Sequence, residues 1–211
     1  MCTARVKRAL ARGFGREQVD EGRVKRHRQI AEAAYGQLAE HGYGGASMLR
    51  IARAAKASNE TLYRWYGDKD GLFAAMVRDN AEAARALLQE ALVRDEAPAE
   101  TLARVAPVLL SMLLGDRAIL LNRAAAADPS GRLGAAISAG GRDVVMPLLE
   151  QLMERLGGDV VPGEASGWFL GLLVGDLQVR RIIGELTEPG AEEIAARCHR
   201  ALGIFNRLLG V

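Results

Sequence analysis

The distribution of proline constrains the fold more than any other feature of the sequence. All six prolines lie at or after Pro98, so the first 97 residues contain no residue that breaks a helix by lacking an N–H. No long segment alternates apolar and polar residues with the β-branched and aromatic enrichment of a strand. Ala, Leu, Arg and Glu, which are strong helix formers, dominate instead. The sequence therefore predicts an all-α protein.

Apolar spacing, capping residues and turn residues place the individual helices. The first is expected from about Arg23 to His41, two short helices begin after Ser47 and Ser58, and a long helix follows at about 68–93. Five more are expected at 99–114, 117–127, 133–157, 164–186 and 190–209. Pro107 and Pro147 fall inside two of them, where we expect kinks.

The helices group into domains. We expect a basic, flexible arm at 1–22, a helix-turn-helix domain at 23–75 and a larger helical domain at 76–211. The chain of 211 residues, with 49% hydrophobic and 26% charged residues, is typical of a globular protein. Its longest apolar run, 168–175, is too short for a membrane span, and 1–28 lack the apolar core of a signal peptide.

Cysteine and histidine usage gives little support to an enzyme. Two distant cysteines, Cys2 and Cys198, cannot form a disulfide framework, so we expect a cytoplasmic protein. The three histidines have no zinc-binding spacing and are expected at the surface or at helix ends. No glycine-rich segment continues as a phosphate-binding loop. We therefore predict no catalytic activity, no metal and no cofactor.

Charge is divided unevenly along the chain. Residues 1–28 carry nine Lys or Arg and three Asp or Glu, which gives a charge of +6. Residues 29–80 are neutral and 81–211 carry −4, so the net charge of +2 conceals a change of sign. This asymmetry indicates that the N-terminal part of the chain binds an anionic partner and that the C-terminal part does not.

The informative segment is 47–66, where two short helices flank a turn of three or four residues, the layout of a helix-turn-helix. Leu62 and Tyr66 would face inward, leaving a polar face for a major groove. The positions expected to face bases are Asn59, Glu60, Thr61 and Arg64. Those expected to contact phosphates are Ser47, Ser58, Tyr63 and Lys69. The alternative is a helix pair with only a structural role, in a helical protein-interaction or small-molecule-sequestering module.

Residues 28–75 resemble the DNA-binding domain of the TetR (tetracycline repressor) family of bacterial transcriptional regulators. The matching runs are RQIAEAA at 28–34, LAEHGY at 38–43, SNETLYRWY at 58–66 and DKDGLF at 68–73. The resemblance implies an all-α, ligand-responsive repressor, with a palindromic double-stranded operator, a second copy of the chain and a small-molecule effector as partners. It matches Ser47, Tyr63 and Lys69 to phosphate contacts and the base-facing positions to the groove.

Two residues depart from the family pattern. The turn often has glycine where this chain has Lys56, and lysine there would cost on the order of 1 kcal/mol if the backbone is left-handed. Lys56 could also add a phosphate contact. The family often has glycine or alanine where this chain has Glu60. A carboxylate near phosphates is repelled, so Glu60 either turns away or accepts a hydrogen bond from cytosine.

The C-terminal helices are rich in apolar residues, and two roles are expected for them. The last two helices would pair with their symmetry mates in a homodimer. The candidate interface residues are Val174, Leu177, Ile194, Cys198, Leu202 and Phe205. An effector pocket, expected to take an apolar or amphipathic ligand, would be lined by Leu88, Leu92, Leu109, Met112, Leu113 and Leu120, with Arg123 or Asp176 as the polar anchor. Each of these residues has plain core packing as its alternative.

Overall fold

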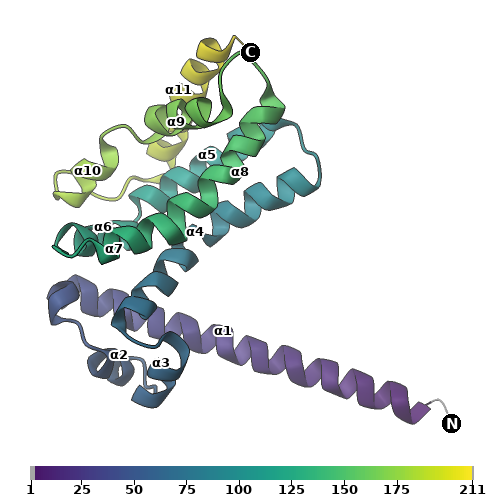
Figure 1. Cartoon of the computed structure of the whole chain (residues 1–211), viewed down its shortest axis with the longest axis vertical. Helices are drawn as coiled ribbons and strands as arrows, with labels where there is room; N and C mark the ends of the chain where they lie inside the picture. Colours follow the sequence, from purple (N-terminus) through teal and green to yellow (C-terminus); the bar gives the residue numbers. More distant parts are fainter. Residues whose placement is uncertain (1–2, 211) are drawn as a thin grey trace. The chain divides into compact units, whose positions relative to one another are not determined.

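The protein is described here from a computed structural model, which covers the backbone of residues 3–210 and the side chains of residues 22–210. Every element in this part of the chain is helical, as Figure 1 shows, so the all-α prediction is confirmed. The chain divides into two compact units, Met1–Lys69 and Asp70–Val211, so the second unit begins slightly before the predicted boundary at 75/76. Among the described helices, none alone is long and apolar enough to cross a membrane; only α5 (Pro98–Leu114) and α6 (Asp116–Ala126), bent by 51°, pass that test as a pair.

Three helices make up the first unit: α1 (Thr3–Gly45), α2 (Met48–Ala54) and α3 (Asn59–Tyr66). The backbone of α1 begins well before Arg23, where we expected the first helix to start. Its regular part ends where predicted, because Gly42 has a φ of 65° that no helix accommodates. Cys2 and the side chains of the basic segment 1–21 lie outside the described residues, and the mobility of the arm stays a prediction.

The turn between α2 and α3 depends on two serine caps and one left-handed residue. Ser47 Oγ accepts a hydrogen bond from Arg50 N at 3.3 Å and caps α2, and Ser58 Oγ accepts one from Thr61 N at 3.1 Å and caps α3. Lys56, between them, has a φ of 50°, so the strain that the sequence suggested for this position is present.

The second unit contains the remaining helices and one π-helical turn. After α4 (Lys69–Val93), most of which belongs to this unit, and the pair α5 and α6, the elements are α7 (Arg132–Ile137), the π-helical turn η1 (Ser138–Arg142), α8 (Asp143–Leu156), α9 (Pro162–Val174), α10 (Leu177–Ile182) and α11 (Ala191–Leu209). Helix α5 lies at the centre, where it contacts α6, α8, α9, α10 and α11. Its side chains Leu102, Val105, Leu109 and Leu110 are almost completely inaccessible to solvent.

Two of the predicted helices are interrupted. The segment 133–157 contains the π-helical turn, whose i→i+5 geometry places one extra residue in the helix. The segment 164–186 ends as a continuous helix at Val174, because Gly175 has a φ of 54°, and resumes only as the short α10. Pro107 and Pro147 do lie inside helices, α5 and α8. The kinks expected at these prolines stay a prediction.

Replacing Lys56 by glycine is expected to stabilise the first unit. Glycine adopts a φ of 50° without the steric cost that a side chain carries, so the free energy of unfolding should rise by about 1 kcal/mol. Lys56→Ala is the matched control, because it removes the same charge and keeps the strain. Urea unfolding followed by circular dichroism measures the difference, and equal stability of the two variants would contradict the prediction.

Candidate functional site

The outer surface of α3 presents the polar side chains that the sequence predicted. Asn59, Glu60 and Arg64 are exposed, and Tyr63 is 49% exposed, whereas Leu62 between them is completely buried in the first unit. Glu60 lies in the first turn of α3, where a carboxylate is favoured by the positive end of the helix dipole. Leu62 therefore anchors α3 in the core of the first unit, while the polar side chains of the opposite face are exposed.

Three of the predicted DNA contacts also shape the site itself. Ser47 and Ser58 use their hydroxyls as helix caps, as described above. Thr61 is only partly exposed, and its Oγ1 lies 2.8 Å from Ser58 Oγ, so the two hydroxyls share a hydrogen bond. These residues fix where α2 and α3 begin. A phosphate contact would be a second role beside this capping.

Helix α1 holds α3 and the preceding turn through three basic or aromatic contacts. Arg26 donates from Nη1 to the carbonyls of Ala55 and Lys56, each at 3.3 Å. His27, which is half-buried at the surface, lies with Nδ1 2.7 Å from the hydroxyl of Tyr66. Arg23 lies over the Trp65 ring at 5.4 Å. No local pattern in the sequence indicates these contacts, because they join residues far apart in the chain.

Lys69, which we predicted to contact a phosphate, makes contacts within the protein, and the phosphate contact stays a prediction. Its Nζ donates to the carbonyl of Tyr43 at 2.7 Å and to that of Ala46 at 3.1 Å, and it lies 4.1 Å from the centre of the Tyr43 ring. A cation at the first residue of α4 is disfavoured by the helix dipole, so these contacts are what retains it there. Lys69 thus connects the start of α4 to the α1–α2 turn.

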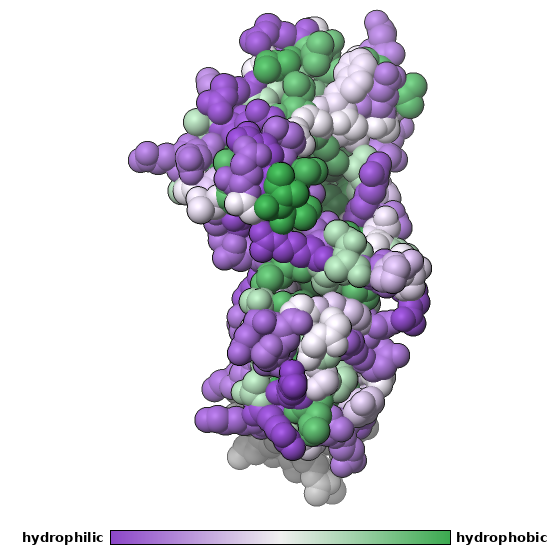
Figure 2. Space-filling view, turned by 90° about the vertical axis from the view of Figure 1, so that its left-hand side faces the viewer, coloured by the Kyte–Doolittle hydropathy of each residue, from purple (hydrophilic) through white to green (hydrophobic). Residues whose placement is uncertain are grey.

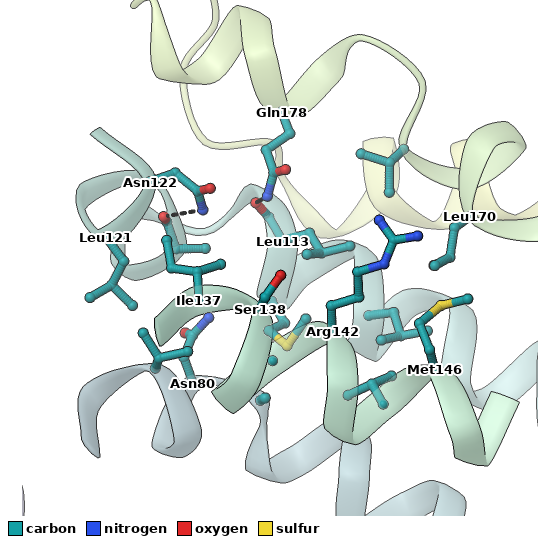
Figure 3. A pocket seen from close by; sticks show the side chains of 18 of the residues that line it. Asn80, Leu113, Leu121, Asn122, Ile137, Ser138, Arg142, Met146, Leu170 and Gln178 are labelled. Atoms are coloured by element: carbon teal, nitrogen blue, oxygen red, sulfur yellow. Dashed lines mark hydrogen bonds between the residues drawn. The ribbon is translucent and has the colours of Figure 1, made fainter. Parts of the chain in front are cut away.

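A cavity of about 520 Å³ lies inside the second unit. It is enclosed by α4, α5, α6, the α7–η1 segment, α8, α9 and α10 (Figure 3). Most of its lining is aliphatic, from residues such as Leu109, Met112, Val145 and Leu170. This volume falls within the range of small-molecule sites, which are typically apolar with a few placed polar groups.

Only part of the predicted pocket lining lies in this cavity. Leu109, Met112 and Leu113 do, but Leu88 and Leu92 are buried in the core instead, and Leu120 is not among the lining residues. Both predicted polar anchors lie elsewhere: Arg123 donates to the carbonyls of Arg181 and Ile182, and Asp176 lies by Arg180, with its side chain 74% exposed. These five residues therefore do not line this cavity, which corrects their assignment to it.

The polar residues of the cavity were missed by sequence analysis. They are Asn80, Asn122, Ser138, Arg142 and Gln178, which lie on four different elements (Figure 3). Two of them lie on the π-helical turn, where buried positions step by five from Gly140 to Val145, against four from Val145 to Leu149. This spacing is visible only in the burial of the folded chain, so the sequence carried no signal for it.

Gly140 brings this turn directly against α4. A Cβ at Gly140 would lie 2.9 Å from Cγ1 of Val77 and 3.2 Å from Cγ of Arg78, closer than side chains normally pack. Only glycine therefore fits this contact without displacement. Because the neighbouring Gly141 and Arg142 line the cavity, the cavity wall and α4 share one closely packed segment.

The predicted dimer interface is corrected in part. Ile194, Cys198 and Phe205 are almost completely buried within the chain's own core, so they offer no surface to a partner. Burial also raises the pKa of the Cys198 thiol, which keeps it protonated. Val174, Leu177 and Leu202 are half-buried, and Val174 lines the cavity. The apolar side chains that do reach the surface of α9 and α11 are Trp168, Ile204 and Leu208.

Removing the Lys69 ammonium is expected to destabilise the protein in the absence of any DNA. Lys69→Met leaves the carbonyls of Tyr43 and Ala46 without this donor and should lower the free energy of unfolding by about 1–3 kcal/mol. Lys25→Met is the control, because Lys25 is exposed on α1. Thermal unfolding by calorimetry measures both variants. An unchanged melting temperature for Lys69→Met would show that the ammonium contributes no stability.

Comparisons with known proteins agree with this architecture. Residues 30–76 match the family described as bacterial regulatory proteins, tetR family. The HTH-type transcriptional repressor AcnR of Corynebacterium efficiens is 38% identical over 58 residues, which are 28% of this chain and 31% of that protein. The aligned segment thus spans about a third of the relative's length.

Solved structures extend the similarity to the second unit. The TetR transcriptional regulator from Agrobacterium tumefaciens is 29% identical with a TM-score of 0.65, covering 87% of this chain and 93% of that one. The flavonoid-responsive regulator FrrA is 26% identical with a TM-score of 0.60, covering 87% of this chain and 96% of that one. Residues 30–76 thus belong to the tetR family of bacterial regulatory proteins by sequence, and the whole chain has the architecture of a TetR transcriptional regulator.

Proposed function

We propose that this protein is a transcriptional repressor that binds a palindromic DNA operator as a homodimer and is released from it by a small molecule. The observation that carries the proposal is the exposed polar face of α3. Serine caps fix the start of both α2 and α3, so this face is held in place. A recognition helix needs such a face to enter a major groove, and it needs a rigid support to hold its register.

Within this proposal, the residues of α3 divide between base and phosphate contacts. Arg64 can donate two hydrogen bonds to a guanine, and Asn59 can pair with an adenine. Tyr63, half-exposed on the same helix, offers a hydroxyl to the phosphate backbone. Lys69 acts indirectly, because its ammonium is already bound to two carbonyls of the α1–α2 turn. The basic segment 1–28 adds attraction that does not depend on sequence.

Dimerisation and ligand release are proposed for the second unit. Trp168, Ile204 and Leu208 expose apolar surface on α9 and α11, which are packed side by side. Apolar side chains also reach the surface on the face drawn in Figure 2. The cavity supplies a place for an effector, and the name of the similar regulator FrrA records a response to a small molecule in that protein.

Substitutions on α3 should separate base contacts from phosphate contacts. A cognate duplex is first selected from a random pool with the wild-type protein. Arg64→Ala should then lose about 1–3 kcal/mol on this duplex and accept changes at one base pair, because a bidentate contact is lost. Tyr63→Phe should weaken binding about equally on all duplexes. Gel-shift titrations at several salt concentrations measure both variants, with Arg207→Ala on α11 as the control.

Two outcomes would contradict the DNA-binding proposal. One is a wild-type protein that selects no sequence from the pool. The other is binding whose strength does not change with salt, because every phosphate contact formed by Lys or Arg releases counterions. Either result would favour a helical module that binds proteins or small molecules and whose helix pair is structural.

A charge on the exposed part of α11 should separate the two copies. Leu208→Glu places a carboxylate on an apolar side chain that is 54% exposed, so the protein should sediment as a monomer and lose operator affinity. Val93→Glu is the matched control, because Val93 is 87% exposed and lies on neither helix. Sedimentation equilibrium measures the mass. A monomeric wild type, or a Leu208→Glu dimer, would overturn this interface.

A further inference from the structure

The cavity of the second unit contains one cation and no carboxylate. Of the residues that line it, Arg142 alone is charged, and no acidic side chain of the described residues forms an ion pair or a hydrogen bond with its guanidinium. Arg142 lines the cavity and is also exposed to solvent. An arginine that lines a cavity without a partner retains five donors in a planar arrangement that matches a carboxylate.

Two amides in the cavity have a settled orientation. Asn122 Nδ2 donates to the carbonyl of Ala118, and Gln178 Nε2 donates to that of Leu113, both at 2.9 Å. Since a carbonyl oxygen can accept only from the NH₂ end, the oxygens of both amides are left as acceptors (Figure 3). Acceptors favour a neutral hydroxyl or N–H group nearby and disfavour a second negative charge.

The remainder of the cavity wall is aliphatic or thioether in character. Leu109, Met112, Leu113, Val145, Met146 and Leu170 supply most of this surface. A charged group placed among them would lose its hydration without compensation, whereas a hydrocarbon chain or ring would gain by burial. The lining therefore fits a molecule that is apolar over most of its length and carries its charge at one end.

We propose that this cavity binds an amphipathic monoanionic organic acid, whose carboxylate pairs with Arg142 and whose apolar body fills the space between α5, α8 and α9. The proposal rests on the proposed function, because it names the chemistry of the effector that releases DNA. It replaces Arg123 and Asp176 as polar anchors with a residue whose guanidinium no acidic side chain of the described residues engages. Arg142 is the last residue of the π-helical turn, and Gly140 of the same turn packs on Val77 of α4. The ligand's carboxylate would therefore be bound two residues along the chain from that contact.

The test compares ten-carbon probes on the whole protein, below their micelle concentrations. Isothermal titration calorimetry measures the Kd of decanoate, 1-decanol, decylamine and decanedioate. Decanoate should bind most tightly, because decanol lacks the charge, decylamine has the opposite charge and decanedioate would bury a second carboxylate. Equal affinity for decanoate and decanol would overturn the proposal.

Variants of Arg142 identify the anchor. Arg142→Gln should weaken decanoate binding about ten- to hundredfold and leave decanol unchanged, because only the charge-assisted pair is lost. Arg142→Glu should reverse the preference toward decylamine, an outcome that a misfolded protein could not give. Arg207→Gln on α11, outside the cavity lining, is the control and should bind decanoate as the wild type does. Unchanged decanoate binding by Arg142→Gln would refute the assignment.

Gel shifts with the ligand-free protein keep this proposal separate from the proposed function. A protein that binds its selected duplex but not decanoate would overturn the ligand chemistry alone. A protein that binds decanoate through Arg142 but selects no duplex would overturn the repressor and support the cavity. If both hold, decanoate should release wild-type protein from the duplex at concentrations that leave Arg142→Gln bound.

Discussion

The architecture depends on cationic side chains that satisfy the carbonyl groups at helix C-termini. A helix leaves its last four carbonyls without partners, and a protein built from many short helices has many of them. Here Lys69 donates to the end of α1, Arg26 to the end of α2, and Arg197 to Leu173 at the end of α9. Each of these bonds joins elements that are distant in sequence, so each fixes a tertiary contact as well as a helix end.

The same rule explains how the second unit holds α10, one of its two shortest α-helices. Arg181, almost completely buried, donates to Leu114 at the end of α5 and to Leu186 beyond α10, and it pairs with Asp116 at 2.6 Å. Arg123 donates to the last two carbonyls of α10. Because these guanidiniums are used to hold the backbone, neither is available for a ligand. Arg142 differs from them in having no such partner among the described residues.

Sequence reasoning was most successful where the signal is local. The caps Ser47 and Ser58, the break at Gly42 and the inward Leu62 all follow from spacing and residue type, and they define the helix pair. It was least successful where a side chain's role depends on what lies across the fold. Lys69 looks the same in the sequence whether it binds a phosphate or the carbonyls of Tyr43 and Ala46. Likewise, nothing near Leu88 or Ile194 distinguishes core from cavity or interface.

The π-helical turn at Ser138–Arg142 gives this chain a particular tolerance to changes of length. Loss of one residue within the turn can be absorbed by conversion to α-helical geometry, so that α7 and α8 remain joined as one helix. Each residue in an α-helix accounts for about 100° of rotation, so a deletion elsewhere in α8 would turn its buried side chains out of the core, whereas the turn already holds one residue more than an α-helix needs. A single codon lost within the turn would thus preserve the fold.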